Sequence, residues 1–175
     1  MSNLQQELRS RRSCRNFKPI MPSREEIDQI IGVGLYAPTG MGKQSTRIIA
    51  VTNKRLRDLI ADENARIGGW KEGFDPFYGA PVILIVIADA SCPTAVYDGS
   101  ACLAQMMISA QDLGLSTCWI HRAKEEFEEE FGKKILAELG LEGEYIGIGH
   151  LALGYAAEPL PAPAERLKDR AFYLE

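Results

Sequence analysis

The sequence of 175 residues contains few cysteines and no long hydrophobic run. Its four cysteines form neither Cys-x-x-Cys pairs nor the spacing of a zinc site, and a chain of this length does not need disulfides to fold. The longest apolar stretches, 80–88 and 101–110, are shorter than the roughly 20 residues of a membrane-spanning helix. Residues 1–8 also lack the apolar segment of a signal peptide. We therefore expect a cytoplasmic protein that binds no metal and does not enter a membrane.

Basic residues are outnumbered by acidic ones. Lys and Arg total 20 against 24 Asp and Glu, so the net charge is −4 and the pI about 5.3. Nucleic-acid binding depends on a clustered positive surface, and we expect no nucleic-acid partner. With 46% hydrophobic residues, the chain can supply the core of one domain spanning residues 1–175. Its last part, 156–175, holds three closely spaced prolines, which favour an extended C-terminal arm.

Side chains suited to acid–base or hydrolytic catalysis are scarce. His121 and His150 are the two histidines, and neither belongs to a Gly-x-Ser-x-Gly elbow or a His-Glu-x-x-His motif. Cys118, next to Trp119 and Ile120, is more typical of a packed strand thiol than of a nucleophile. Redox chemistry would therefore have to come from a bound cofactor, and we assign no catalytic side chain.

The hydrophobic periodicity predicts helices and strands that do not alternate regularly. A capping box from Ser23 to Glu26 begins a helix that ends before Pro38. The apolar run 81–88 is expected to be a central strand, buried on both faces. The other expected helices are 3–12, 54–67, 97–113 and 123–139, the last broken at Gly132, and the other expected strands are 47–52, 115–120 and 145–154. This order favours an α+β sandwich over a doubly wound parallel sheet.

The expected helix 97–113 has apolar or small side chains almost all round. Such a helix cannot face water, and so short a chain has little core in which to enclose it. We therefore expect one side of this helix to form a subunit interface.

Three arginines lie within five residues of an otherwise acidic chain. Arg11, Arg12 and Arg15 flank Ser13 directly after the first expected helix. One guanidinium group can donate hydrogen bonds to two phosphate oxygens at once, and a serine hydroxyl adds a further donor. The segment therefore suits the phosphate monoester of a cofactor. The spacing is also compatible with a solvated basic patch that pairs with acidic residues, since surface arginines are common. The residues alone leave both interpretations open.

Two segments contain closely spaced glycines. Residues 37–44 follow a helix and match neither a P-loop nor a dinucleotide-binding fingerprint, so a plain turn is the default interpretation. Gly147 and Gly149 lie within the last expected strand and predict close backbone packing or a bulge.

Six segments, each of modest specificity, follow one another along nearly the whole chain. They are Arg11-Arg12-Ser13-Cys14-Arg15 with Phe17, Tyr36-Ala37-Pro38-Thr39-Gly40 with Gln44, residues 75–81, Asp98-Gly99-Ser100, residues 113–124, and Gly147-Ile148-Gly149-His150 with Gly154-Tyr155. In this order they resemble the nitroreductase family of FMN-dependent oxidoreductases.

The resemblance implies an α+β sandwich with a central, mainly antiparallel sheet flanked by helices, assembled as an intertwined homodimer with FMN at the interface. It also implies a ping-pong reaction, in which NADH or NADPH reduces the flavin at N5 and a nitroaromatic, quinone or similar small acceptor reoxidises it. Two alternatives are a flavin-binding or storage protein with little turnover, and a structural dimer whose basic segment pairs with acidic helices.

The resemblance assigns three groups of residues to FMN. The phosphate and ribityl region would be held by Arg11, Arg12, Ser13, Arg15 and, from the arm, Arg166, with Arg15 also placing positive charge near flavin N1. The side chain of Asn64 would bond the pyrimidine edge of the ring or the ribityl chain. The backbone of Trp119, Ile120, His121 and Arg122 would pass beside the ring near its reactive nitrogen. The partner subunit would contribute Pro38, Thr39 and Gly40.

The chain departs from the family pattern at two places. The common Asn-x-Gln-Pro-Trp reads Gly42-Lys43-Gln44-Ser45-Thr46 here, and the frequent Lys-Pro-Arg of the C-terminal region reads Ala164-Glu165-Arg166. The first change predicts an altered acceptor specificity. The second removes a cation and adds an acid beside the expected phosphate site, which predicts weaker FMN binding.

Overall fold

In the computed structural model, which describes residues 3–175, the run predicted as the central strand forms β2 (Val82–Asp89). Every side chain from Val82 to Ala88 is fully buried. Ile83, Ile85 and Ile87 belong to one hydrophobic core, and Val82, Leu84 and Val86 belong to another, because successive side chains of a strand point to opposite faces. Strand β2 is therefore covered on both faces, as the absence of alternation in its sequence predicts.

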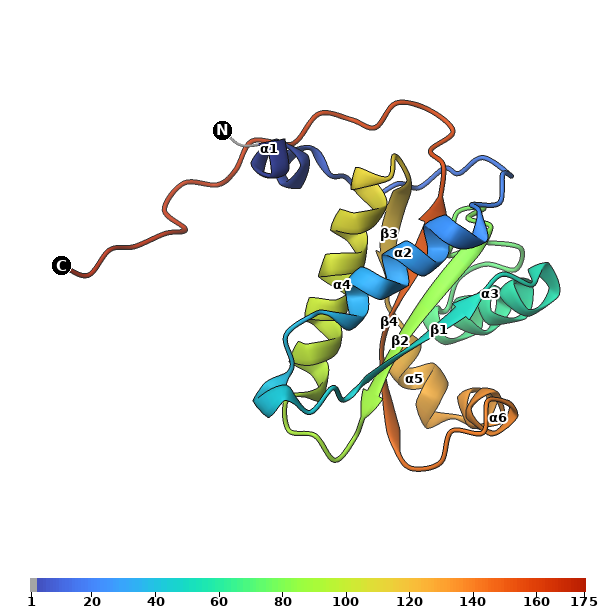
Figure 1. Cartoon of the computed structure of the whole chain (residues 1–175). Coiled ribbons are helices and arrows are strands. Elements are labelled where there is room, and N and C mark those ends of the chain that lie inside the picture. Colours follow the sequence, from blue (N-terminus) through green and yellow to red (C-terminus); the bar gives the residue numbers. More distant parts are fainter. Residues whose placement is uncertain (1–2) are drawn as a thin grey trace.

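Four strands form one antiparallel sheet in the order β1-β2-β4-β3. The other three strands are β1 (Thr46–Val51), β3 (Ser116–Ile120) and β4 (Tyr145–Gly154). In this register Ile85 of β2 lies opposite Ile49 on one side and His150 on the other, so His150 falls in the middle of the sheet. Helices cover both faces, and the predicted α+β sandwich with an antiparallel sheet is confirmed (Figure 1).

A bulge interrupts the pairing of β2 with β4. Val86 pairs with Gly149 and Ile87 with Gly147, which leaves Ile148 without a partner on β2. A Cβ atom at Gly147 would lie 1.9 Å from the carbonyl oxygen of Ala123. The predicted bulge and the predicted close packing therefore both occur here, and Gly147 lets β4 touch the backbone of the helix that begins at Ala123.

Helices α2 (Arg24–Leu35) and α4 (Ala95–Asp112) cover one face of the sheet (Figure 1). The predicted capping box is present, with the Glu26 amide donating to Ser23 Oγ over 3.1 Å and the Ser23 amide donating to Glu26 Oε2 over 2.7 Å. Helix α4 begins two residues earlier than expected. The core that α2 and α4 share contains Ile27, Ile30, Leu103 and Met106.

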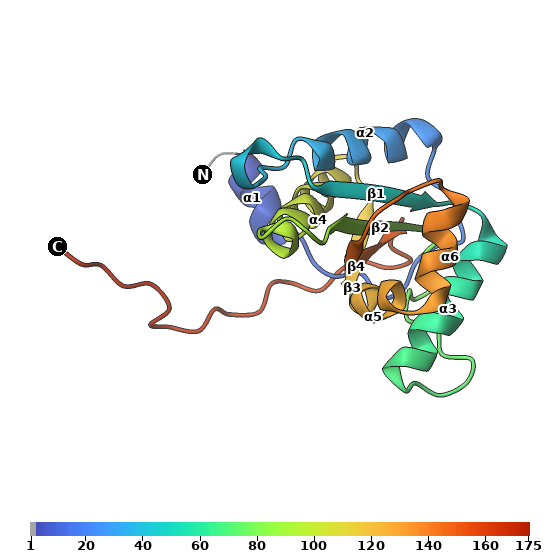
Figure 2. The same ribbon diagram turned by 90° about the horizontal axis from the view of Figure 1, so that it is seen from below.

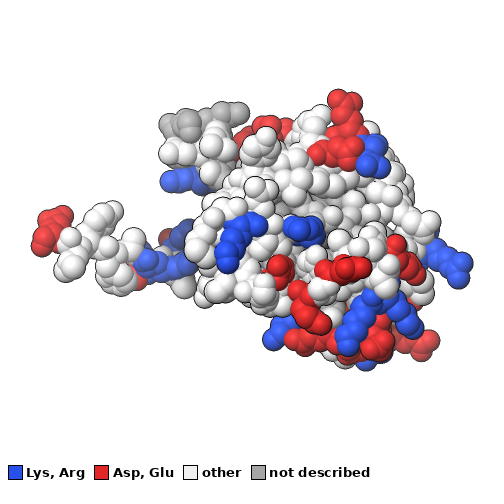
Figure 3. Space-filling model, turned by 60° about the horizontal axis from the view of Figure 1, so that its bottom comes forward, with Lys and Arg blue, Asp and Glu red and all other residues white. Residues whose placement is uncertain are grey.

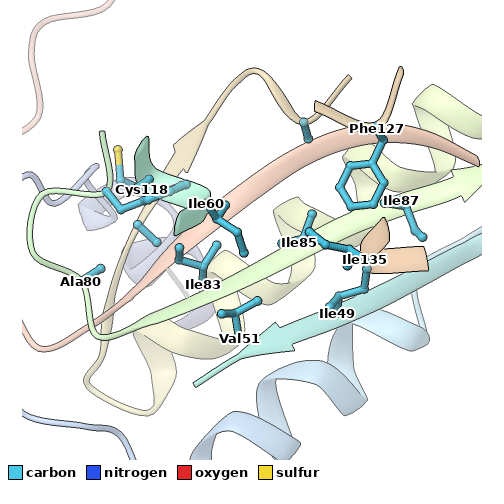
Figure 4. Close-up of a cluster of buried hydrophobic side chains, with 14 of the residues drawn as sticks. Ile49, Val51, Ile60, Ala80, Ile83, Ile85, Ile87, Cys118, Phe127 and Ile135 are labelled. Carbon is cyan, nitrogen blue, oxygen red and sulfur yellow. The ribbon is translucent and has the colours of Figure 1, made fainter. Parts of the chain in front are cut away.

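Helices α3 (Lys54–Gly68), α5 (Ala123–Glu128) and α6 (Glu130–Glu138) cover the other face, where their side chains meet Ile83, Ile85 and Ile87 (Figure 4). The predicted helix 123–139 is indeed divided, but the predicted break at Gly132 is wrong. The chain turns at Glu129, which has extended backbone angles. Gly132 lies inside α6, where a Cβ atom would come within 2.5 Å of Phe127 Cα, so the glycine permits close packing of α6 on α5.

The two ends of the chain lie outside these layers. Helix α1 (Asn3–Ser10) ends two residues before the expected position, because the chain becomes extended from Arg11 and runs along the sheet. The loop after α2 contains the short 3₁₀ turn η1 (Gly40–Gly42). Beyond Ala156 the described chain has no helix or strand, and it leaves the body as an extended segment (Figure 2). Residues 1 and 2 of the predicted domain lie outside the described residues.

Surface charges of both signs occur close together. Figure 3 shows Lys and Arg side chains next to Asp and Glu side chains along the lower part of the view, with a broad uncharged area above them. Several ion pairs join neighbours within one helix, such as Arg24 with Asp28. None of the helices within residues 3–175 combines the length and apolarity that crossing a membrane requires.

Candidate cofactor site

The basic N-terminal segment lies along the edge strand β3. Ser13 forms a parallel bridge with Thr117, and the Cys14 amide donates to the Thr117 carbonyl over 2.9 Å. Cys14 and Phe17 are buried and anchor the segment in the core, whereas Arg15 is exposed. The three arginines are therefore held at one end of β3 by their apolar neighbours.

These arginines lack the acidic partners that the interpretation as a solvated basic patch predicts. Arg11, Arg12, Arg15 and Arg166 form no ion pair within the described part of the chain. Arg11 Nη1 and Arg12 Nε are buried nitrogen atoms without a hydrogen-bond acceptor. A buried donor without an acceptor costs about 1–3 kcal/mol. An anion at this position would satisfy both donors, and the segment therefore fits a phosphate group.

The C-terminal arm brings a further cation to the same place. Burial first, and then the positive charges of Arg166 and Arg11, lower the pKa of Arg12. The other two nitrogens of the Arg12 guanidinium donate to the carbonyls of Arg9 and Arg11, which caps the end of α1. The structure thus groups the predicted phosphate residues Arg11, Arg12 and Arg166, and it leaves Arg11 with more free donors than Arg12.

The root of the arm is tied to the N-terminal segment. Phe17 bridges Ala156, the Ala157 amide donates to the Asn16 carbonyl over 2.9 Å, and Asn16 Nδ2 donates to Glu158 over 3.1 Å. A cavity of about 250 Å³ lies between the two segments, lined by residues 13–16 and 158–161. The predicted residues Ser13 and Arg15 both face this cavity.

A second group of predicted residues surrounds a cavity of about 190 Å³ at the other end of β3. Its wall contains Asn64, Trp119, Ile120, His121 and Arg122, together with the aromatic residues Trp70, Phe74 and Tyr78 of the loop before β2. Trp119 Nε1 is a further buried donor without an acceptor. The structure therefore brings Asn64 together with the four residues whose backbone was predicted to pass beside the ring.

Asn64 already has partners within the chain. Its Nδ2 donates to the His121 carbonyl over 2.8 Å and to Glu126 Oε1 over 2.9 Å, and the residue is 1% exposed. The side chain thus fixes the turn between β3 and α5. Its predicted bond to a flavin remains a prediction.

Strand β3 connects the two groups. From Thr117, beside Ser13, to His121 the chain advances four residues, or about 13 Å in extended conformation. Cys118 lies between them and is 2% exposed, which confirms the predicted packed thiol. Burial raises the pKa of Cys118, against the opposite effect of the positive charge of Arg15 and of a hydrogen bond from Ser13. One continuous edge therefore carries a cationic end and an aromatic end.

The sequence interpretation missed a buried pair behind this edge. His150 Nε2 lies 2.8 Å from Glu126 Oε2, and both side chains are almost completely buried. One signal was available in the sequence: Glu126 lies three residues after Ala123 and one before Phe127, which places it on the apolar side of the helix. A charged residue at such a position indicates a buried partner.

The predicted residues Pro38, Thr39 and Gly40 are not part of this edge. The Gly40 amide donates to Asp98 Oδ1 over 3.0 Å in the first turn of α4, whereas Gln111 near the other end of α4 contacts Glu7 and Ser10 of α1. The 18 residues of α4 span about 27 Å. Within one chain, the loop and the arginine cluster therefore lie at opposite ends of α4 (Figure 1).

The fold and this edge define an α+β protein with a candidate site for a ligand that carries an anionic group at one end and a planar ring at the other. The family model of nitroreductases matches residues 8–155, and the chain belongs to the nitroreductase family. A nitroreductase with bound FMN from Desulfitobacterium hafniense DCB-2 is 27% identical, with a TM-score of 0.89 and 100% of both chains covered. An FMN-dependent nitroreductase from Clostridium difficile R20291 is 26% identical over 96% of each chain, with a TM-score of 0.76.

A nitroreductase with bound FMN from Bacteroides fragilis NCTC 9343 has the same fold, with 24% identity, a TM-score of 0.86 and 100% of both chains covered. Comparison with curated protein sequences gives no significant match.

Proposed function

We propose that this protein is an FMN-dependent oxidoreductase that passes reducing equivalents from NADH or NADPH to a nitroaromatic, quinone or similar small acceptor. The observation that carries the proposal is the edge of β3, which joins unneutralised arginines to an aromatic-lined cavity. Membership of the nitroreductase family and the FMN bound in two similar structures support it. The alternating reaction with donor and acceptor belongs to the same proposal.

The arginine cluster would bind the FMN phosphate. Arg11 and Arg166 offer guanidinium donors without acidic partners, and the Ser13 hydroxyl adds a neutral donor in the adjoining cavity. Arg12 contributes its free Nε and its charge. Arg15 is exposed beside the same cavity, and we assign it to the ribityl chain and to the N1 side of the ring.

The other end of β3 would hold the ring. FMN, when bound, supplies the two-electron chemistry at N5, so the protein has to orient the ring and limit its contact with water. The backbone from Trp119 to Arg122 offers groups at the sheet edge for this task, and Asn64 holds that backbone in place. No side-chain acid or base is assigned.

The proposed site needs a second copy of the chain. Pro38, Thr39 and Gly40 lie at the far end of α4 from the arginines, so they can contribute only to the site of a partner subunit. On α4, Ala104 and Ile108 are half-buried and belong to neither core that the sheet shares with its helices. These apolar residues suit a homodimer interface along α4.

The arm suits an intertwined dimer. Strand β1 is at the edge of the sheet, and beside it lies an apolar groove of about 540 Å³ whose lining includes Ile31, Leu35, Ile48 and Leu141. Residues 172–174 at the end of the arm are apolar and almost fully exposed. Insertion of a partner's arm beside β1 would cover both the groove and the apolar residues 172–174.

Purification and reconstitution with FMN test the proposal. The protein should gain the visible absorbance of bound flavin in a 1:1 ratio per chain, and anaerobic NADH or NADPH should bleach it. Addition of a nitroaromatic or a quinone should restore the colour. Protein that stays colourless with excess FMN would refute the proposal, whereas bound flavin that neither nicotinamide bleaches would favour a flavin-binding protein with little turnover.

A further inference from the structure

A charged residue is buried behind the proposed ring end of the site. Glu126 is 1% exposed, and its Oε2 lies 2.8 Å from Nε2 of His150, which is 0% exposed. His150 Nδ1 has no partner among the described residues, so the contact with Glu126 is the one hydrogen bond of the imidazole there, and an Nε2–H in it donates to the Glu126 carboxylate. Burying a carboxylate is costly, and well-packed apolar residues often replace such a pair without loss of stability. Stability alone therefore does not explain the pair.

The second carboxylate oxygen extends the contact toward the site. Glu126 Oε1 accepts from Asn64 Nδ2 over 2.9 Å, and the same Nδ2 donates to the His121 carbonyl over 2.8 Å. A continuous chain of polar contacts thus runs from β4 through α5 and α3 to the backbone of the turn that lines the aromatic cavity. We name His150, Glu126, Asn64 and the His121 carbonyl the buried polar chain.

The turn at the end of this chain is strained and close to the surface. Arg122 has a φ of 85°, in the left-handed region that non-glycine residues seldom adopt, and its side chain is exposed. On the inner side, Ile120 pairs with His150 across β3 and β4. The turn is therefore linked to His150 in two ways. The backbone pairing of β3 with β4 holds Ile120, and the buried polar chain holds the neighbouring His121 carbonyl.

We propose that Glu126 is a positioning residue that fixes the backbone of residues 120–122 for FMN. This inference depends on the proposed FMN site, because the turn is the part of the chain assigned to the flavin ring. Glu126 itself does not line the cavity, so it acts through Asn64 and His121.

Two substitutions at Glu126 separate positioning from packing. Glu126→Leu keeps the volume approximately but removes both acceptors, whereas Glu126→Gln can accept from Asn64 and donate to the imidazole after a change of tautomer. Glu128→Gln and Glu128→Leu, on the exposed side of the same helix, are the matched controls. Three quantities are measured: the amide hydrogen exchange of residues 120–123 without FMN, the FMN dissociation constant, and the midpoint potential of bound FMN.

In Glu126→Leu we expect exchange at 120–123 to rise at least about tenfold and the FMN dissociation constant to rise by a similar factor, since the turn opens locally. The midpoint potential should shift as well. Glu126→Gln should keep the exchange and the FMN dissociation constant within about threefold of the wild-type values, because the contacts are rebuilt. Its midpoint potential should equal that of the wild type. If Glu126→Leu does not fold, Asn64→Ser breaks the buried polar chain at its next link, and exchange without FMN reports the result free of any direct FMN contact.

The outcomes distinguish the two proposals. Wild-type protein that binds no FMN refutes the proposed function and this inference together. Wild-type protein that binds FMN, with Glu126→Leu folded and unchanged in exchange, affinity and potential, refutes the positioning role alone. A lower melting temperature without any of the three changes would also contradict it, since that result describes a packing role.

Discussion

The Asp98 carboxylate lies 2.8 Å from the hydroxyl of Ser45, and this contact ties α4 to the loop that precedes β1. Asp98 also accepts from the Gly40 amide over 3.0 Å and from the Thr94 hydroxyl over 3.1 Å, and it is 4% exposed. The loop that holds Thr39 and Gly40 is therefore fixed to the beginning of α4. In the proposed dimer, this is the loop that reaches the partner's site.

Asp98→Asn should lower the free energy of unfolding by about 2 kcal/mol at pH 7, because charge-assisted hydrogen bonds become neutral or are lost. Burial by itself raises the pKa of Asp98, but hydrogen bonds from Ser45, Gly40 and Thr94 outweigh it, and the net pKa is lowered. The stabilising effect is thus complete above the ordinary carboxyl pKa of about 3.9 and disappears as the pH falls through the lowered value.

Urea unfolding of the wild type and of Asp98→Asn between pH 7 and pH 2.5 measures this effect. The difference in stability should shrink below a pH of about 4. Asp62→Asn, an exposed position on α3, should change stability little at any pH. A difference for Asp98→Asn that stays constant to the lowest pH would contradict the assignment.

Gly147→Ala should destabilise the fold by about 3 kcal/mol, because the new methyl group meets the carbonyl oxygen of Ala123, which belongs to the backbone and cannot rotate away. Chemical denaturation provides the measurement. Gly32→Ala is the control: apart from the backbone of α2 itself and the chain neighbours, no atom of the described chain lies within 4 Å of the added Cβ, and the substitution should stabilise by roughly 0.5–1 kcal/mol. Equal stabilities of the two variants would show that β4 and α5 pack differently.

Arg11→Ala and Arg166→Ala should each weaken FMN binding by about 1.5–3 kcal/mol, the usual size of a hydrogen bond from a charged group. The dissociation constant then rises by about 10- to 150-fold, which quenching of FMN fluorescence can measure. Arg24→Ala removes an exposed arginine paired with Asp28 and should leave the affinity unchanged. Affinities equal to wild type in both site variants would remove the phosphate assignment.

Ile108→Asp should convert the dimer to a monomer, since it places a charge on the apolar side of α4 that no core covers. Sedimentation velocity at micromolar concentration distinguishes the two states. Leu59→Asp makes the same chemical change on the exposed side of α3 and should leave the dimer intact. A wild-type protein that sediments as a monomer would contradict the proposed assembly.

Local interactions made much of the fold predictable. The capping box of Ser23 and Glu26, the apolar period of α2 and the continuous apolar run of β2 each act within a few residues, and the expected elements fall within about two residues of those observed. The bulge was equally local, because Gly147 and Gly149 lie only two residues apart in the strand, on either side of Ile148. The break before α6 was misplaced because Gly132 allows close packing, a property that depends on Phe127.

The candidate site was predictable as a list of residues but not as an arrangement. The sequence by itself determined which groups are available: the arginines after α1, the aromatic and polar residues at 119–122, and a buried period that includes Glu126. Tertiary structure alone decided that the bridge of Ser13 to Thr117 places the arginines on β3, and that Glu126 meets His150, 24 residues away. It also set Gly40 at the far end of α4 from Arg11. Strand register and helix packing join residues remote in sequence, and short-range periodicity carries no information about such contacts.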